Sequence, residues 1–369
     1  MYNLLYDYQI LLMQKYGGIS RYFYEVIERV PREEFKLLFP VIGNQNYYFQ
    51  DYFGKEIRDI HGMKNYNRIV KMNQAYTRHL LKKGKDNIVF HPTYYNPYFL
   101  DGFKGKLVVT VHDMIHENYP EYYGGNATIG HKKSLMDRAD KIIAVSKTTK
   151  RDILKIYPDI DENKIAVIYH GNVKESPVIV NEVYAEKYLK NGKYVLYVGN
   201  RDRYKNFHNF AVAVASILKK DDKLQLVCVG GGELLPEEKE IFENEDCLNR
   251  VIQVGASEEE LVWLYQNASC FAFPSKAEGF GIPILEAWKN KCPVILSDMD
   301  CFREVGSEAA MYFNPDSPND IQDKVADVLY GTVGAELVQR GTEREKEFSW
   351  DKCAREHFEV YKEVCEKVK

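Results

Sequence analysis

The sequence lacks the features that mark membrane-spanning, secreted and nucleic-acid-binding proteins. No run of about 18 apolar residues occurs among its 369 residues, so we expect no membrane-spanning helix. Residues 1–18 contain neither a basic segment nor a small-residue cleavage site, so no signal peptide is expected. The net charge of −4 gives no general attraction to nucleic acid. Internal repeats and low-complexity tracts are also absent.

Cysteine is absent before residue 228, and the seven cysteines that follow form no C-x-x-C pair. Their number is odd, and several lie inside apolar patterns typical of strands. Buried, reduced thiols fit this distribution better than a disulfide framework or a zinc site. The sequence therefore favours a cytoplasmic protein.

The composition is that of a globular protein, with 45% hydrophobic and 28% charged residues. A chain of this length predicts about two domains. Tyrosine is abundant, at 28 residues. Ordinary packing accounts for such an excess, but aromatic faces also suit contact with sugars or lipids, so both interpretations stay open.

Short apolar runs alternate with helical patterns along most of the chain, with a polar interruption after residue 171. The expected strands are residues 3–6, 36–42, 87–90, 107–111, 141–145, 164–169, 194–198, 224–229, 251–254, 270–273, 294–297 and 311–313. The expected helices include residues 19–30, 66–83, 147–156, 206–218, 258–267, 283–290 and 318–330, with a charged pair after about 334. Continuous apolar strands between helices predict parallel sheets covered on both faces. We therefore expect an α/β protein with two Rossmann-like, doubly wound domains.

The segment EGFGIPILE, residues 278–286, follows an expected strand and begins an expected helix. Open parallel sheets bind ligands at the carboxyl ends of their strands, so this loop is a candidate site. Gly279 and Gly281 allow close approach of a ligand, and a helix N-terminus favours phosphate. Glu278 and Glu286 would repel an anion unless they contact hydroxyl groups instead. A nucleotide sugar has phosphates between two sets of hydroxyls, although ordinary capping also explains such a loop.

A second strand-end segment, YVGNRDRYKNF, carries several cations before a helix. Arg201, Arg203 and Lys205 can neutralise a diphosphate and the charge that develops as it leaves. A basic loop of this kind is by itself often only a solvated surface. Its position at the same sheet edge as Glu278 favours a phosphate-binding loop.

The first half offers further candidates at strand ends. Gly17 and Gly18 precede a helix, and His112 and Asp113 follow a strand. The spacing of His112 and His116 is compatible with a metal, but the glutamate that follows the first histidine in zinc proteases is replaced by aspartate. Other polar and aromatic strand-end residues that could line an acceptor site are His91, Tyr94 and Tyr95. Packing is an equally good explanation for these three.

Several segments together resemble the retaining nucleotide-sugar glycosyltransferases of family 4, which have the GT-B fold of two domains facing across a cleft. The segments, in chain order, are IIAVSKTTKRDI, VIYHGN, YVGNRDRYKNF, ASEEELVWLYQNA, EGFGIPILE and SDMDCFREVGSEAAMYF. The E-x7-E pattern of EGFGIPILE is highly specific for this family. The resemblance covers essentially the whole chain, although residues 44–86 are not distinctive.

The resemblance implies roles for individual residues. Glu278 would contact the donor sugar, and Glu286 the ribose. The diphosphate would be met by Arg201 and Lys205. Other donor contacts would come from the backbone of Gly17, Gly18, Phe280, Gly281 and Ile282. Many members have arginine directly after the strand-end glycine, where this chain has Asn200, which makes Arg201 the less secure of the two cations.

In the first domain, the resemblance implies that His112 lies near the reacting sugar. The catalytic residues would then be His112, Lys205 and Glu278, and the acceptor side would be formed by His91, Tyr94, Tyr95 and Asp113. The implied domains are residues 1–172 for the acceptor, residues 173–348 for the nucleotide sugar, and a helix in 349–369 that packs back on the first domain.

The implied activity is transfer of a hexose from a nucleotide sugar to a saccharide acceptor, with retention of anomeric configuration. The YVG-x-R-x-x-YKNF form looks closest to bacterial O-antigen and capsule transferases, which favours a GDP-mannose-type donor and a lipid-linked acceptor. No N-domain carboxylate stands out as a nucleophile, so front-face attack is favoured over double displacement. The alternatives are a catalytically inactive carbohydrate-binding scaffold and a GT-B epimerase or phosphorylase.

We expect no cofactor and no metal. Cations and helix amides can neutralise the diphosphate, and no D-x-D triplet of the metal-binding transferase type is apparent. The expected helix near residues 64–85 carries seven cations: Lys64, Arg68, Lys71, Arg78, Lys82, Lys83 and Lys85. Ile69, Met72 and Leu80 fall near one helical face. A helix docked on the domain core explains this pattern, and so does weak peripheral contact with the inner face of an anionic membrane.

Overall fold

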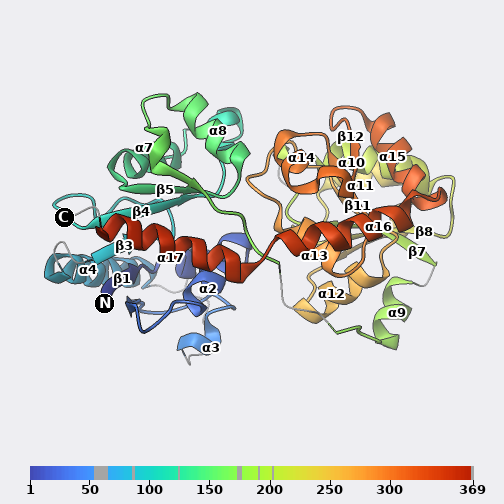
Figure 1. Ribbon diagram of the computed structural model, residues 1–369. Helices are drawn as coiled ribbons and strands as arrows, with labels where there is room; N and C mark the ends of the chain where they lie inside the picture. The colour runs from blue at the N-terminus through green and yellow to red at the C-terminus, as the bar shows by residue number, and fades with distance from the viewer. Residues whose placement is uncertain are drawn as a thin grey trace. The chain divides into compact units, whose positions relative to one another are not determined.

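The computed structural model describes residues 1–53, 65–84, 88–123, 125–172, 177–189, 192–201 and 203–366. The chain forms two compact units. Unit 1 consists of Met1–Gly171 with Trp350–Lys369, and unit 2 of Asn172–Ser349. Figure 1 shows that each unit has its own sheet with helices packed around it.

Unit 1 contains, in the described part of the chain, a parallel sheet of six strands in the order β2-β1-β3-β4-β5-β6. The strands are β1 (Tyr2–Tyr6), β2 (Phe35–Leu38), β3 (Ile88–His91), β4 (Lys106–Val111), β5 (Lys141–Ala144) and β6 (Ile165–Val167). The chain runs outward from β1 to β2 and then returns to the other side of β1 with β3. The point where the winding direction reverses therefore lies between β1 and β3, and ligands bind at such points in open α/β sheets.

Unit 2 repeats this arrangement, again with six parallel strands among its described residues, in the order β12-β11-β10-β7-β8-β9. The strands are β7 (Lys193–Val198), β8 (Leu224–Val229), β9 (Val251–Val254), β10 (Cys270–Phe273), β11 (Val294–Ser297) and β12 (Met311–Phe313). Here the winding reverses between β7 and β10.

The prediction of two doubly wound α/β units with parallel sheets is confirmed, and each expected strand is present. β2 ends at Leu38, whereas the sequence predicted a strand through residue 42. Pro40 follows within two residues, and proline has no N–H with which to continue a ladder. β6 is also shorter than expected.

The helices of unit 1 are α1 (Gln9–Met13), α2 (Gly18–Glu28), α3 (Gln50–Phe53), α4 (Tyr66–Gly84), α5 (Ile115–Asn118), α6 (Pro120–Tyr123), α7 (Thr128–Arg138), α8 (Lys147–Ile156) and α17 (Trp350–Glu366). Those of unit 2 are α9 (Glu182–Tyr188), α10 (Phe207–Leu218), α11 (Pro236–Glu243), α12 (Glu258–Asn267), α13 (Ile282–Lys289), α14 (Asp300–Gly306), α15 (Pro318–Tyr330) and α16 (Val333–Arg344). No helix in the described ranges combines the length and apolar character needed to cross a membrane.

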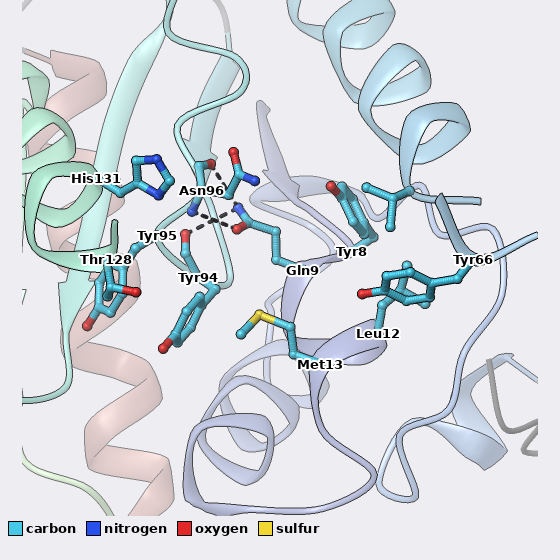
Figure 2. A pocket seen from close by; sticks show the side chains of 11 residues that line it. Tyr8, Gln9, Leu12, Met13, Tyr66, Tyr94, Tyr95, Asn96, Thr128 and His131 are labelled. Atoms are coloured by element: carbon cyan, nitrogen blue, oxygen red, sulfur yellow. Dashed lines mark hydrogen bonds between the residues drawn. The ribbon is translucent and has the colours of Figure 1, made fainter. Parts of the chain in front are cut away.

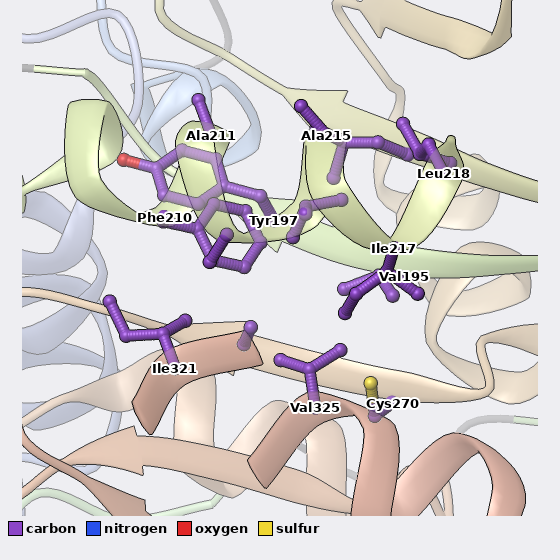
Figure 3. Close-up of a cluster of buried hydrophobic side chains, with 14 of the residues drawn as sticks. Val195, Tyr197, Phe210, Ala211, Ala215, Ile217, Leu218, Cys270, Ile321 and Val325 are labelled. Atoms are coloured by element: carbon purple, nitrogen blue, oxygen red, sulfur yellow. The ribbon is translucent and has the colours of Figure 1, made fainter. Parts of the chain in front are cut away.

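The apolar core of unit 2 lies between its sheet and the helices α10 and α15. Tyr197 on β7 stacks on Phe210 of α10 with ring centroids 5.8 Å apart. Ile321 and Val325 of α15 close the cluster from the other side (Figure 3). The seven cysteines are free thiols, and all except the half-buried Cys365 are buried, as the sequence predicted.

The C-terminal helix α17 packs on unit 1, where a buried chain of hydrogen bonds joins it to the sheet and to α2. The chain of side chains runs, in order, through Tyr6, Tyr361, His91, Thr110, Tyr22 and His357, and ends at the carbonyl oxygen of Cys353. Two of its members, His357 and Tyr361, lie on α17 itself. Segments at opposite ends of the sequence are therefore held together by polar contacts as well as by apolar packing.

The direction of this chain is fixed at one end, because a carbonyl oxygen only accepts. His357 Nδ1 therefore donates to Cys353 O over 2.7 Å, and because burial keeps the ring neutral, His357 Nε2 accepts from the hydroxyl of Tyr22. Because the Tyr22 hydroxyl has given its proton to that bond, the hydroxyl of Thr110 donates to Tyr22. Thr110 Oγ1 therefore accepts from the ring N–H of His91, and His91 Nε2 donates to it over 2.9 Å. Both histidines are neutral in this arrangement. Burial lowers the pKa of His357 to about 4 and that of His91 well below its usual value.

Candidate active site

The candidate site in unit 2 lies at the carboxyl ends of β7 and β10, where the winding of the sheet reverses. Lys205 follows β7, and Glu278 follows β10. Lys205 Nζ lies 2.6 Å from Glu278 Oε1. The backbone N–H of Lys276 also donates to the carbonyl of Tyr204 over 2.7 Å, which ties the two loops together. The structure thus brings together Lys205 and Glu278, the two residues of this domain that were predicted to be catalytic.

The Lys205–Glu278 pair is sheltered but not sealed. Its side chains are 16% and 13% exposed. The ammonium group of Lys205 also lies 5.0 Å from the ring centroid of Tyr204 and 5.4 Å from that of Phe273. Partial burial strengthens electrostatic contacts, while the remaining exposure leaves access for a ligand. A cation held in this way can meet an anion without first being ordered.

The loop after Glu278 turns directly into α13. Gly281 precedes the helix with φ of +101°, and a Cβ atom there would lie 2.9 Å from Ile284 and 3.2 Å from Phe302. Only glycine fits this turn without strain. Phe280 is buried and packs edge-on against Phe348, with centroids 5.7 Å apart. Ile282 is the first helical residue, so the positive end of the helix dipole lies at this loop.

Glu286 lies about one turn into α13 and is half-buried. Its Oε2 accepts a hydrogen bond from the hydroxyl of Tyr265 at 3.3 Å. Burial raises the pKa of Tyr265 well above its usual value, and the Glu286 carboxylate raises it further. Tyr265 therefore stays protonated and holds the carboxylate in position. A carboxylate fixed in this way can accept hydrogen bonds from the hydroxyls of a ribose.

Arg201 donates hydrogen bonds to backbone carbonyls of the protein itself, which the sequence did not predict. Its side chain is 3% exposed, and its Nε lies 2.9 Å from Glu238 Oε2. The remaining guanidinium nitrogens donate to four carbonyl oxygens, those of Gly230, Gly231, Gly232 and Glu233. The three glycines all have positive φ, between +71° and +87°. Arg201 therefore shapes the loop after β8, next to the site, and in this structure its side chain does not lie in the open as a phosphate ligand.

Two serines at the same sheet edge were not assigned a role by the sequence. Ser275 follows β10, and Ser297 ends β11. Both are fully buried, and within the described residues neither hydroxyl has a hydrogen-bond partner. Their only sequence signal was their position at strand ends.

In unit 1, His112 and Asp113 follow β4 as expected. The backbone N–H of His112 donates to the hydroxyl of Tyr95 over 3.0 Å. Burial lowers the pKa of His112 to about 4, although the Asp113 carboxylate raises it. The imidazole is therefore neutral at physiological pH and can accept or relay a proton only as the neutral base.

Asp113 is held in place by Lys132 of α7, a residue that the sequence did not indicate. Lys132 is fully buried, and its Nζ donates to the carbonyl of Asp113 and to Glu117 Oε2, both over 2.9 Å. Burial alone would raise the pKa of Asp113, but Lys132 and the amide of Ile115 hold it below its usual value. Lys132 therefore fixes the turn that carries His112 and Asp113.

His91 was expected on the acceptor side, and the structure contradicts this. Its side chain is fully buried, and both ring nitrogens are occupied by Tyr361 and Thr110. It points into the core under α17, so it cannot touch a substrate. Tyr95 is also nearly buried, at 4%, but it forms part of a pocket wall. Tyr94 is half-buried and lines the same pocket, whose other walls include Tyr8, just before α1, and residues of α1, α4 and α7 (Figure 2).

Gly17 and Gly18 lie where α2 begins. Gly18 is the first helical residue, and Gly17 is extended, with φ of 163°. A Cβ atom at Gly17 would lie 2.8 Å from Gln14 Oε1, so the side chain of Gln14 packs tightly against this turn. The structure thus places this pair at a helix N-terminus of unit 1.

Groups of three or more histidine, cysteine, aspartate or glutamate residues that could hold a metal do not occur among the described residues. The sequence does contain two D-x-D triplets, residues 159–161 and 298–300, so the prediction that it has none was wrong. One contains Asp298, which forms a two-pronged pair with Arg303 at 2.7 and 2.8 Å. The other contains Asp159, which pairs with Lys133 at 2.9 Å.

Family models match both halves of the chain. Residues 16–172 match the model described as glycosyltransferase family 4, and residues 181–347 match that of glycosyl transferases group 1. The second match includes Lys205, Glu278 and Glu286. The first includes the pocket tyrosines Tyr94 and Tyr95.

Two of the curated relatives are O-antigen mannosyltransferases. The chain is 28% identical to the O-antigen chain mannosyltransferase B of Escherichia coli over 301 residues, which covers 76% of each protein. It is 30% identical to the O-antigen chain mannosyltransferase RfbU of Salmonella typhimurium over 222 residues, or 60% of each protein.

Solved structures share the fold across nearly the whole chain. A sucrose-phosphate synthase from Thermosynechococcus elongatus aligns with a TM-score of 0.75 at 19% identity, covering 98% of both chains. HepE from Anabaena, solved with UDP and glucose, aligns with a TM-score of 0.75 at 14% identity, covering 98% of this chain and 100% of that one. At these identities the likeness establishes the fold alone.

Proposed function

Because the chain belongs to the family 4 glycosyltransferases and has the GT-B fold, we propose that it transfers a mannose-type sugar from a GDP-linked donor to a saccharide acceptor, with retention of configuration. Its assignment as a hexosyltransferase of polysaccharide biosynthesis rests on the family matches and on the mannosyltransferase relatives. The observation that supports the donor site is the Lys205–Glu278 pair at the reversal point of the unit 2 sheet.

The donor diphosphate would lie between Lys205 and the N-terminus of α13. There the ammonium group and the helix dipole would stabilise the negative charge that develops on the leaving diphosphate. Glu278 would accept hydrogen bonds from the donor sugar, and Glu286 from the ribose. In this account Arg201 acts indirectly, by holding the loop of three glycines beside the site.

Retention would follow from front-face attack, in which the acceptor hydroxyl approaches from the side on which the diphosphate departs. The leaving diphosphate itself can then take the proton from the acceptor hydroxyl. His112 would lie near the reacting sugar as a neutral hydrogen-bonding group, since burial keeps its pKa at about 4. We infer that no metal is required, because Lys205 and the α13 N-terminus supply positive charge, so turnover is expected to persist when divalent cations are chelated.

The donor base is tested by thermal denaturation in the presence of GDP-, UDP- and dTDP-sugars, since a ligand that binds the native state raises its stability by mass action. The mannosyltransferase relatives favour mannose as the donor sugar, and GDP is the nucleotide that we propose, whereas HepE was solved with UDP. A shift with GDP-mannose that exceeds the shifts with UDP-sugars supports the proposal. A larger shift with a UDP-sugar would reassign the donor.

The acceptor is proposed to be lipid-linked, with the protein held weakly at the inner face of the cell membrane. Residues Tyr66–Gly84 of α4 contain five lysines and arginines and no aspartate or glutamate. The predicted apolar face was partly wrong: Ile69 and Leu80 pack on the domain, but Met72 is 46% exposed. Lys64 and Lys85 lie outside the described residues.

The solvent-facing side of α4 mixes cations with exposed hydrophobic side chains. Met72 and Tyr76 are each 46% exposed. They lie among exposed cations, namely Arg68, Lys71, Lys82 and Lys83. A helix face of this composition favours an anionic lipid surface, to which the cations are attracted and into which the two hydrophobic side chains can insert.

A further inference from the structure

A pocket of 210 Å³ lies in unit 1 where the winding of its sheet reverses. Tyr8 and Gln9 reach it from the segment that follows β1 and begins α1, and Tyr94, Tyr95 and Asn96 reach it from the loop that follows β3. Figure 2 shows Tyr94 and Thr128 on one side of Gln9 and Met13, with Tyr8 and Tyr66 on the other. The reversal point is where an open α/β sheet binds ligands, so the pocket occupies the expected ligand position of its own sheet.

The size of the pocket limits what can enter it. A cavity of about 150 Å³ holds one benzene molecule. The observed 210 Å³ therefore accommodates one six-membered ring with small substituents. Drug-sized ligands, which are closer in size to a nucleotide, need pockets of roughly 300–1,000 Å³. The pocket thus encloses a single ring, and any larger ligand would extend beyond its walls.

The walls are aromatic and polar but carry no strongly charged side chain. The residues that line the pocket are Tyr8, Gln9, Leu12, Met13, Tyr66, Val70, Tyr94, Tyr95, Asn96, Thr128 and His131. None of these is a lysine, arginine, aspartate or glutamate. Tyrosine combines an apolar ring face with a hydroxyl, which matches a sugar ring with its C–H faces and hydroxyl rim. A charged ligand would enter without a counter-ion, at a desolvation cost.

The pocket floor is rigid because a buried carboxylate organises it. Asp7 is fully buried and accepts hydrogen bonds from Thr93 and from Gln9 Nε2, the latter at 2.8 Å. Gln9 Oε1 in turn accepts from the backbone N–H of Asn96 at 2.8 Å. The loops after β1 and β3 are therefore joined before any ligand arrives. A preformed site of this kind loses little conformational entropy on binding.

Two hydroxyl groups of the wall remain available to a ligand. Within the described residues, no hydrogen bond to protein involves the hydroxyl of Tyr94, and Thr128 donates through its backbone N–H rather than its hydroxyl. Tyr95 links the pocket to His112, because its hydroxyl accepts a hydrogen bond from the backbone N–H of His112. A ring in the pocket would therefore lie one side chain away from the turn that carries His112 and Asp113.

We propose that this pocket binds one neutral sugar ring of the acceptor, stacked against Tyr94, and that Tyr94 is the residue that selects it. The acceptor role rests on the proposed transferase function, whereas binding of a neutral pyranose ring does not. Met13, 44% exposed at the edge of the pocket, is a suitable reporter of occupancy.

The experiment uses the full chain labelled with ¹³C at the methionine methyl groups, with Met13 assigned through Met13→Leu. Methyl α-mannoside, methyl α-glucoside, methyl α-galactoside and methyl α-glucuronide are titrated, and each methyl shift is followed by NMR. We expect at least one neutral glycoside to shift the Met13 signal, and the glucuronide to bind more weakly. Tyr94→Ala should weaken binding about tenfold, whereas Tyr47→Ala, at an exposed tyrosine of the same unit, should leave it unchanged.

Val70→Phe provides an independent variant, because it fills the pocket from α4 without removing a wall tyrosine, and it should abolish the Met13 shift. If no neutral glycoside shifts Met13, or if Tyr94→Ala and Val70→Phe bind as well as the wild type, the pocket is not a sugar site. GDP and UDP are titrated in parallel with a thermal readout. Nucleotide binding without any Met13 shift overturns only the pocket proposal, and a Met13 shift without nucleotide binding overturns only the proposed function.

Discussion

Lys205 Nζ and Glu278 Oε1 lie 2.6 Å apart although their residues are 73 positions apart in the chain. The fold produces this contact, because β7 and β10 are neighbours at the reversal point of the sheet. The first prediction concerns the Lys205–Glu278 pair. Lys205→Ala and Glu278→Ala should each reduce kcat by roughly 10²–10³-fold, the usual effect of removing one electrostatic stabiliser.

This prediction is checked by steady-state kinetics with saturating donor. Lys219→Ala is the matched control, since Lys219 is 63% exposed and pairs with Glu245 on the surface of the same unit. It should leave kcat unchanged. Wild-type turnover in either site variant would remove that residue from the catalytic machinery.

The second prediction concerns Arg201, which pairs with Glu238 and binds four loop carbonyls. Arg201→Met leaves a buried carboxylate without its cation, so it should lower the free energy of unfolding by about 3–5 kcal/mol. The double variant Arg201→Met with Glu238→Gln should recover part of this loss. Urea denaturation measures both.

Arg303→Met is the comparison for Arg201, because Arg303 is 49% exposed and its pair with Asp298 is also exposed. Surface pairs contribute about 0–1 kcal/mol. If Arg201→Met were no more destabilising than Arg303→Met, Arg201 would not organise the loop, and its direct contact with phosphate would become the better explanation.

The third prediction concerns acid. His112 and His357 are buried, and both have a pKa of about 4 in the native state. Unfolded histidine titrates near 6.5, so the unfolded state binds more protons below that pH. Stability should therefore be fully present above about pH 6.5 and decline as the pH falls toward 4. At pH 5 the expected loss is ~2 kcal/mol for each histidine.

Urea midpoints between pH 8 and pH 5 test this decline. His357→Gln removes one titrating group, and its stability should depend less steeply on pH than that of the wild type. Gln Nε2 can still donate to a carbonyl, although the bond from Tyr22 must be remade. An unchanged pH slope in this variant would show that His357 is already charged in the native state.

The fourth prediction concerns the exposed face of α4. Changing Lys82 and Lys83 together to glutamate should weaken binding to anionic vesicles by at least about tenfold at low salt, since each cation near the surface adds about 1 kcal/mol. Lys346→Glu with Lys352→Glu changes charge equally at side chains 59% and 53% exposed elsewhere. That control should bind as the wild type does in vesicle co-sedimentation. If both double variants lost the same amount of vesicle binding, the loss would follow from net charge, and the specific role of α4 would be contradicted.

The strands and the Lys205–Glu278 region could be predicted because they depend on local patterns. A buried parallel strand is a continuous apolar run, and its carboxyl end fixes where a following loop must lie. Arg201 was misassigned because its partners come from a loop about thirty residues away, whose three positive-φ glycines turn their carbonyls toward it. Local pattern does not reveal such a partner.

His91 was misassigned for a similar reason. Position at a strand end does not determine which face of the sheet a side chain occupies, and α17, which covers that face, is distant in sequence. The pocket in unit 1 escaped sequence analysis because its walls come from four separate segments. Lys132 was missed because α7 has few apolar residues and a buried lysine is indistinguishable from a solvated one by spacing.

We propose that unit 2 binds a nucleotide sugar at Lys205 and Glu278 and that the sugar is transferred with retention of configuration. The most direct measurement is ¹H NMR of the first product formed from GDP-mannose, in the presence of excess EDTA and a mannoside acceptor. We expect an α-linked mannoside as the first product from the wild type, and product formation roughly 10²–10³-fold slower with Glu278→Ala. A β-linked first product, or undiminished transfer by Glu278→Ala, would contradict it.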